Sequence, residues 1–185
     1  NKIIHIAGKS PYKGTIELVK CWLNHPELPV LTIKTYHGVT SKIKKLLGGK
    51  SVQNIILNDS FISNEEIDKL YNTYGIHICS SYHEGWGHYI AEAKSCRAVV
   101  LYTDAPCMNE TFLDGYDGIA IECDQRPVKY INQLCPYYAV KENDIVNAVQ
   151  KVMNLSLDEK RTIGNNARER FLENDKQFEN RLMNL

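Results

Sequence analysis

Short apolar segments alternate with amphipathic segments along the whole chain. Each apolar segment is rich in Ile and Val and is bounded by turn-forming residues, which is the pattern of a buried β-strand. The strands expected on this ground span residues 2–7, 29–36, 51–57, 76–80, 98–103 and 118–123.

The intervening segments carry their apolar residues at helical spacing. Two of them begin with a capping box, in which a Ser side chain and a Glu three residues later bond each other's backbone N–H groups. These pairs are Ser63 with Glu66 and Ser156 with Glu159. The expected helices span residues 15–25, 41–47, 63–74, 89–96, 143–153 and 156–173.

Nearly all-apolar strands that alternate with helices indicate a parallel sheet that is buried on both faces. We therefore expect an α/β fold: a doubly wound, Rossmann-like parallel sheet of about six strands with helices on both faces. No linker, repeat or low-complexity stretch interrupts this alternation. Residues 1–185 are accordingly expected to form a single domain.

Composition narrows the choice of partners. Lys+Arg and Asp+Glu both number 22, so there is no basic excess of the kind that nucleic-acid binding requires. No apolar run reaches the roughly 18 residues that span a bilayer. Six scattered cysteines without a C-x-x-C pair favour reduced thiols, and we expect a cytoplasmic protein with no transmembrane segment.

The stretch "SSYHEGWGHYIAEA", residues 80–93, concentrates polar chemistry. It superficially resembles a zinc-protease helix, but that site needs two histidines four residues apart on one helix face. His83 and His88 are five apart, with Gly85 and Gly87 between them. We expect no metal site here, and the roles of the two histidines stay open.

A phosphate-binding turn fits the same stretch better. It follows an expected strand at its carboxyl end, where doubly wound sheets bind ligands. Gly85 and Gly87 allow the backbone to approach a ligand closely, and they precede a helix whose N-terminal N–H groups attract anions. Glu92 lies about five residues further on, a rise of roughly 7.5 Å, which suits the ribose of a bound nucleotide.

These residues carry a family resemblance. Glu84-Gly85-Trp86-Gly87 followed by Glu92-Ala93 resembles the E-x7-E signature, E-G-[FW]-G-x4-E-A, of retaining group 1 glycosyltransferases of the GT-B type. "IAGKSPYKG" near the amino end resembles the segment that opens their carboxyl-terminal domain. "APCMNETFLDGYDGIAIEC" resembles the segment that follows the signature. The resemblance covers nearly the whole chain, from Ile3 to about Phe178.

The resemblance implies a hexosyltransferase donor domain that uses a UDP-, GDP- or ADP-linked sugar and retains anomeric configuration. Lys9 and Lys13 would neutralise the diphosphate, Glu84 would face the transferred sugar, and these three would be the catalytic residues. Phe61 and Ile62 would wall the base pocket, and Glu92 would bind the ribose. The implied donor-binding set is Gly8, Lys9, Lys13, Phe61, Ile62, Glu84, Gly85, Trp86, Gly87 and Glu92. No metal and no cofactor are implied.

An amino-terminal domain that supplies the acceptor site is expected to be missing, so the fragment should be inactive alone. The acceptor, the sugar and the oligomeric state are not identified by these residues. The sequence departs from the family pattern at Lys9, where many members have Arg, at Arg97, where Gly is usual, and at Val99, where Pro is usual. The alternatives are a GT-B-like nucleotide-sugar epimerase or phosphorylase, or a non-catalytic nucleotide-binding or assembly module of the same fold.

Overall fold

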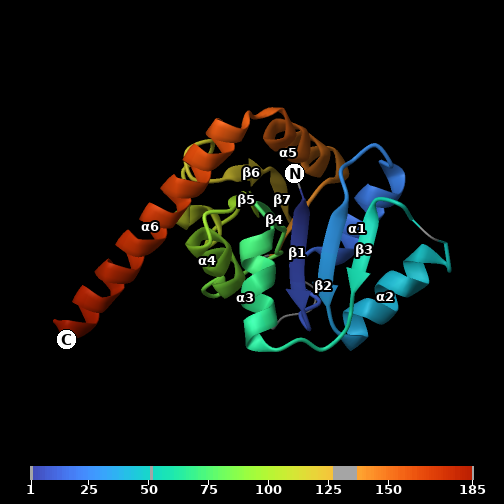
Figure 1. Ribbon diagram of the computed structural model, residues 1–185, viewed down its shortest axis with the longest axis horizontal. Helices are drawn as coiled ribbons and strands as arrows, with labels where there is room; N and C mark the ends of the chain where they lie inside the picture. Colours follow the sequence, from blue (N-terminus) through green and yellow to red (C-terminus); the bar gives the residue numbers. More distant parts are fainter. Residues whose placement is uncertain (1, 51, 127–136, 185) are drawn as a thin grey trace.

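The computed structural model describes residues 2–50, 52–126 and 137–184. Its main sheet has six parallel strands in the order β3-β2-β1-β4-β5-β6 (Figure 1). The strands are β1 (Ile3–Gly8), β2 (Leu31–Thr35), β3 (Ile55–Asn58), β4 (Ile76–Cys79), β5 (Val99–Thr103) and β6 (Ile119–Ile121). The helices are α1 (Thr15–Asn24), α2 (His37–Leu47), α3 (Asn64–Thr73), α4 (His88–Ser95), α5 (Glu142–Asn154) and α6 (Leu157–Met183).

Strand β5 shows why both faces of the sheet are apolar. Val99 and Leu101 point into one core cluster, which also contains residues of α1, α2 and α5. Val100 and Tyr102 point into the opposite cluster, which contains residues of α3 and α4. Because successive side chains of a strand face opposite sides, a strand buried on both faces must be apolar throughout. The predicted α/β, doubly wound fold is confirmed.

Several predicted boundaries were wrong by a few residues. The third strand starts at Ile55, because the Asn54 side chain donates to the carbonyls of Trp22 and His25 and holds the chain in a turn. Helix α2 begins at His37 instead of 41, and α6 continues to Met183, past 173, since no Gly or Pro follows Gly164.

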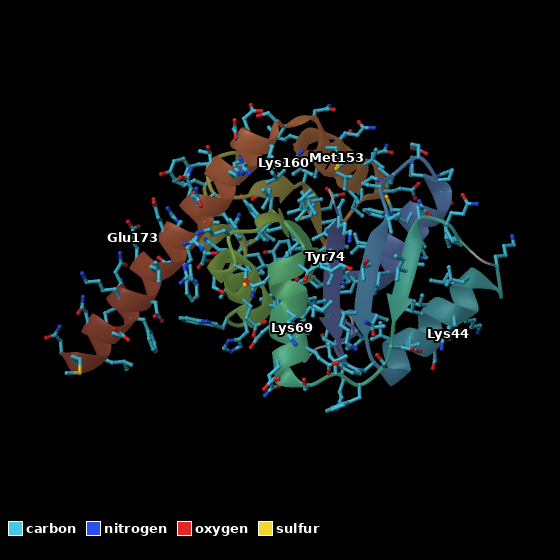
Figure 2. All side chains as sticks on the ribbon, in the orientation of Figure 1. Lys44, Lys69, Tyr74, Met153, Lys160 and Glu173 are labelled. Carbon is cyan, nitrogen blue, oxygen red and sulfur yellow. The ribbon has the colours of Figure 1, made fainter. Side chains whose placement is uncertain are left out.

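A two-stranded antiparallel sheet was not predicted. It pairs β7 (Cys123–Arg126) with β8 (Tyr137–Val140). Both capping boxes are confirmed, at Ser63 and at Ser156. Charged side chains such as Lys44, Lys69 and Glu173 project outward from their helices (Figure 2).

Arg97, which stands where the family pattern usually has Gly, adopts a backbone conformation that is typical of glycine. Its φ is +58°, the left-handed conformation in which glycine is usual. The residue follows α4, and its carbonyl lies so close to Gly164 of α6 that a Cβ there would come within 2.1 Å of the oxygen. The close packing of α4 against α6 therefore requires a glycine at position 164.

The sheet order reverses between β1 and β4, which are neighbours although far apart in sequence. At such a switch point the loops leaving the two strands diverge, and a crevice opens at their carboxyl ends. The loops here are residues 9–14 after β1 and residues 80–87 after β4. Helix α4 begins directly after the second loop.

In residues 2–50, 52–126 and 137–184, no helix is long and apolar enough to cross a membrane. The five cysteines in these ranges, Cys21, Cys79, Cys96, Cys107 and Cys123, are free thiols, and Cys135 lies outside them.

Candidate functional site at the sheet switch point

The loops after β1 and β4 are bonded to each other. The backbone N–H of Tyr82 donates to the Tyr12 carbonyl at 2.9 Å, and the Ser80 hydroxyl donates to the Lys13 carbonyl at 3.1 Å. Gly14 makes this approach possible: its φ is +67°, and a Cβ there would lie 2.1 Å from the Ser80 carbonyl oxygen. The two loops therefore form one rigid wall at the switch point.

An ion pair between Lys13 and Glu84 lies at the centre of this wall. Lys13 Nζ is 2.5 Å from Glu84 Oε1, and the two side chains are 16% and 12% exposed. The Ser81 hydroxyl donates to the same carboxylate oxygen and lies 2.6 Å from the Tyr89 hydroxyl. The Lys13 ammonium also sits 3.6 Å from the centroid of the Tyr89 ring. Glu84 is thus oriented from two sides.

Gly87 forms the N-cap of α4. Its φ is +76°, and its carbonyl accepts from the N–H groups of Ile90 and Ala91. The N–H groups of His88 and Tyr89, the first two residues of the helix, have no carbonyl of the helix to bond, and both residues line one cleft with Glu84. Together with the helix dipole, this arrangement favours an anion. Gly85, by contrast, does not adopt a positive φ.

Glu92 is held by a residue that the sequence did not single out. The Tyr71 hydroxyl donates a hydrogen bond to Glu92 Oε2. Tyr71 is buried, and its ring stacks on His77 at a centroid distance of 5.3 Å and an interplanar angle of 1°. Burial, reinforced by the Glu92 carboxylate, raises the pKa of Tyr71, so the phenol keeps its proton and stays a donor.

A cleft of about 400 Å³ lies at this end of the sheet. It is lined by five of the predicted donor-binding residues, namely Gly8, Lys13, Ile62, Glu84 and Glu92. Lys34 and Tyr36 line it as well. Lys9, Phe61 and Gly85 do not line this cleft. Lys9 is exposed, and Phe61 is 88% exposed.

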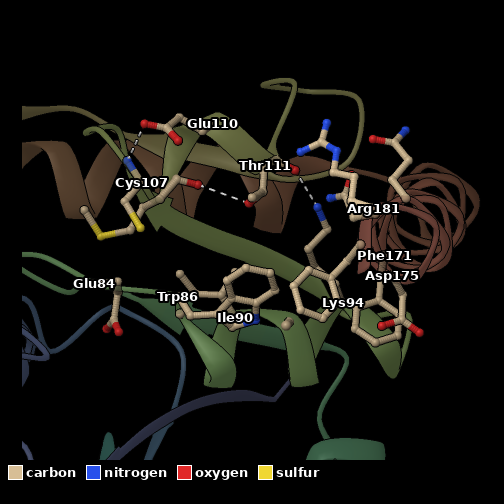
Figure 3. A pocket seen from close by; sticks show the side chains of 16 residues that line it. Glu84, Trp86, Ile90, Lys94, Cys107, Glu110, Thr111, Phe171, Asp175 and Arg181 are labelled. Atoms are coloured by element: carbon tan, nitrogen blue, oxygen red, sulfur yellow. Dashed lines mark hydrogen bonds between the residues drawn. The ribbon is translucent and has the colours of Figure 1, made fainter. Parts of the chain in front are cut away.

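Trp86 and Gly87 line a second cavity, of about 380 Å³, which shares Glu84 with the first. This cavity lies between α4, the 3-10 helix η1 (Asn109–Thr111) and α6 (Figure 3). The Trp86 ring meets that of Phe178 edge-on at 5.7 Å. The thiol of Cys107 donates to the Gly85 carbonyl at 3.2 Å and so ties the loop after β5 to the Glu84–Gly87 turn.

Lys94 lines the second cavity. It is almost fully buried, and its ammonium donates to the Thr111 carbonyl at 2.6 Å, as Figure 3 shows. Asp117, also fully buried, accepts from it at 3.3 Å. Burial lowers the pKa of Lys94, while the Asp117 carboxylate opposes that effect.

His83 and His88 form no hydrogen bond with the Lys13–Glu84 ion pair among the contacts described for it. His88 is exposed and lines the first cleft, and the His83 ring lies 5.2 Å from that of Tyr12. Across the residues that the structure describes, no group of three His, Cys, Asp or Glu side chains is arranged to hold a metal ion.

Several residues of the site had no role predicted from the sequence, among them Lys34, Tyr36, Tyr71, Ser81 and Tyr89. Tyr71 lies within the helix expected at residues 63–74, and Ser81 stood in the quoted stretch without a role. Lys34 did leave a signal, because a lysine inside an otherwise apolar strand segment is unusual.

The family model for glycosyl transferases group 1 matches residues 37–136, which is more than half of the chain. The chain belongs to this family. The matched segment contains Glu84 and Glu92, whereas Gly8 and Lys13 precede it.

Individual relatives agree with this assignment. Over 123 residues, 62% of this chain, it is 27% identical to the UDP-N-acetylglucosamine–peptide N-acetylglucosaminyltransferase GtfA subunit of Streptococcus pneumoniae. The chain spans about a quarter of that relative, because the alignment covers 24% of its length.

Solved structures show the same fold. The carboxyl-terminal domain of LpcC, a group 1 glycosyl transferase from Francisella tularensis, matches with a TM-score of 0.71 at 16% identity, over 93% of this chain and 85% of that one. Anabaena HepE, solved with UDP and glucose, matches with a TM-score of 0.69 at 17% identity, over 100% of this chain and 48% of its own. The fold is therefore that of a GT-B carboxyl-terminal domain.

Proposed function

We propose that residues 1–185 form the donor-binding domain of a retaining hexosyltransferase, which transfers a hexose from a nucleoside-diphosphate sugar. The observation that carries this proposal is the convergence of Lys13, Glu84 and Glu92 on one cleft beside the N-terminus of α4. Membership of the glycosyl transferase group 1 family supports the transferase chemistry.

The diphosphate would occupy the space in front of Gly87 and Lys13. There the first N–H groups of α4 and the Lys13 ammonium supply positive charge from opposite loops. Because negative charge grows on the leaving diphosphate as the glycosidic bond breaks, fixed cations at this position stabilise the transition state. This arrangement requires no metal ion, and we propose that the transfer proceeds without one.

The bond between Lys13 and Glu84 gives donor binding a specific consequence. A diphosphate that accepts from Lys13 competes with Glu84 Oε1, which now lies 2.5 Å from the ammonium. Ser81 would keep the carboxylate in place through its own hydrogen bond. Glu84 would then be available to the hydroxyl groups of the transferred sugar.

Glu92 would accept hydrogen bonds from the two ribose hydroxyls. Its side chain lies further along α4, on the cleft that Gly8, Ile62 and Tyr36 also line. Lys9 and Phe61 are exposed in the donor-free domain and would have to close over the ligand to contribute. Lys13 is therefore the lysine on which the proposal chiefly rests.

UDP is the first nucleotide to test. HepE was solved with UDP-glucose, and the S. pneumoniae relative is named for UDP-N-acetylglucosamine. The sugar would be selected near Glu84 and the loop at residues 104–110, which Cys107 joins to the motif. The acceptor would be bound by another part of the full protein, and this domain alone would not transfer sugar.

A calorimetric titration with UDP, GDP and ADP, with and without EDTA, tests the proposal. We expect one nucleotide to bind, with the same affinity in the presence of the chelator. Failure of all three at millimolar concentration would contradict it. Binding followed by transfer in the full-length protein separates a transferase from a non-catalytic module, and retention of the sugar's configuration in the product separates it from an inverting enzyme.

A further inference from the structure

Lys34 is a fully buried lysine at the carboxyl end of β2, beneath the donor cleft. Its ammonium donates to the carbonyl of Ser60 at 2.6 Å and to that of Thr35 at 3.3 Å. Within the described residues, no carboxylate lies within ion-pairing distance of it. Asp59 is the nearby acid, and its carboxylate is bonded to Lys44 at 2.8 Å.

A charge buried without a counter-ion is costly, so its position calls for a reason. The groups that Lys34 contacts belong to two separate segments, the end of β2 and the segment after β3. Both segments continue directly into residues that line the cleft, Tyr36 on one side and Ile62 on the other. The ammonium therefore fixes two cleft walls relative to each other.

Tyr36 is the more informative of these neighbours. The Lys34 ammonium lies 3.7 Å from the centroid of its ring, in a cation–π contact. The ammonium thereby covers one face of the ring, and Tyr36, which is half-buried, also lines the donor cleft. An aromatic face of fixed orientation is the surface on which nucleic-acid bases stack.

We propose that Tyr36 is the stacking surface for the base of the nucleotide donor, and that Lys34 is the positioning residue that orients Tyr36 and the Ser60–Ile62 segment around it. This inference rests on the proposed function and assigns the base end of the same cleft. Lys13 and α4 serve the diphosphate, and Lys34 acts on the base through the two walls it holds.

Binding measurements with three ligands separate contacts to the base from contacts to the diphosphate. The ligands are the diphosphate among UDP, GDP and ADP that the wild-type domain binds most tightly, its nucleoside, and inorganic diphosphate. For Lys34→Met, we expect affinity for the nucleotide and for the nucleoside to fall by the same factor, about tenfold, with inorganic diphosphate unaffected. Tyr36→Leu should weaken both base-containing ligands about tenfold, and Tyr36→Phe should restore them.

Two matched controls accompany these variants. Lys45→Met removes an exposed lysine from the helix that follows β2, and Tyr116→Leu removes an exposed tyrosine away from the cleft. Neither should change any of the three affinities.

Three results would overturn the inference. Lys34→Met could weaken nucleotide and inorganic diphosphate but spare the nucleoside, which would make Lys34 a phosphate cation. Unchanged affinities in Tyr36→Leu would show that the base does not stack on Tyr36. This variant tests the role of Tyr36 even if Lys34→Met fails to fold. A wild-type domain that binds no nucleotide would instead reject the proposed function itself.

Discussion

The Tyr71 hydroxyl and the Glu92 carboxylate are joined by a hydrogen bond that connects α3 to α4 in the lining of the donor cleft. Tyr71 therefore sets the position of the carboxylate that we assign to the ribose. Replacing Tyr71 with Phe removes only the hydroxyl. We expect nucleotide affinity to fall by about 1 kcal/mol, the usual contribution of one hydrogen bond, measured by calorimetry.

The control for this effect is a ligand without ribose hydroxyls. Tyr71→Phe should bind the 2′,3′-dideoxy form of the nucleotide as well as the wild type does. Equal weakening of the ribose and dideoxy ligands would show that Tyr71 supports the cleft in general and does not act through Glu92.

Lys13 is predicted to be the main phosphate contact. Lys13→Met should weaken nucleoside diphosphate binding by about 1.5–3 kcal/mol, the range for hydrogen bonds to charged groups, and should reduce its dependence on salt. Lys20→Met, an exposed lysine of α1, serves as the control and should have no effect. Titrations at two salt concentrations measure both quantities, and equal affinities for Lys13→Met and wild type would contradict the role.

Gly14 tests the junction between the two loops. Gly14→Ala places a Cβ 2.1 Å from the Ser80 carbonyl oxygen at a φ of +67°, so we expect the free energy of unfolding to fall by about 3 kcal/mol or more. Gly49→Ala is the matched control, because its φ is +75° and its Cβ meets nothing within 4 Å. It should lose only about 1 kcal/mol from backbone strain. Similar losses in urea titrations of the two variants would show that the loops separate easily.

Two buried histidines predict how stability depends on pH. Burial lowers the pKa of both His5 and His77 to about 4, against about 6.5 in an unfolded chain. Between these values the unfolded state binds more protons, so stability falls as the pH drops from about 6.5 toward 4. Each histidine contributes a slope of up to about 1.4 kcal/mol per pH unit.

Urea unfolding from pH 7.5 to 4.5 measures this slope. His77→Gln should reduce it, because the amide can still donate to the Tyr71 and Tyr74 carbonyls that the His77 Nε2 now contacts, but cannot be protonated in this range. A constant free energy of unfolding between pH 6.5 and 5 would rule out the burial that the prediction assumes.

The fold was predictable because its signals are local. Strands such as Val99–Thr103 are apolar throughout, and the two capping boxes mark helix starts from four residues each. The strand pattern did not predict which strands are neighbours. The resemblance to the GT-B family grouped Gly8, Lys13, Glu84 and Glu92 at one site, and these four residues line one cleft in the structure.

The other features of the site depend on tertiary packing, which the preferences of single residues do not predict. Tyr71 reaches Glu92 only because of how α3 lies against α4, and Lys34 is buried although lysine is usually exposed. The exposure of Phe61 follows from the path of the chain after β3, which no pattern in the sequence specifies. The end of α6 was missed because the apolar periodicity fades while the helix continues.

A crystal structure of the domain with UDP would test the central claim most directly. We predict that the diphosphate lies at the β1–β4 switch point, that Lys13 Nζ has moved from Glu84 to a phosphate oxygen, and that the N–H groups at the start of α4 point at the same phosphate. A diphosphate bound elsewhere, with the 2.5 Å contact between Lys13 and Glu84 intact, would contradict the account.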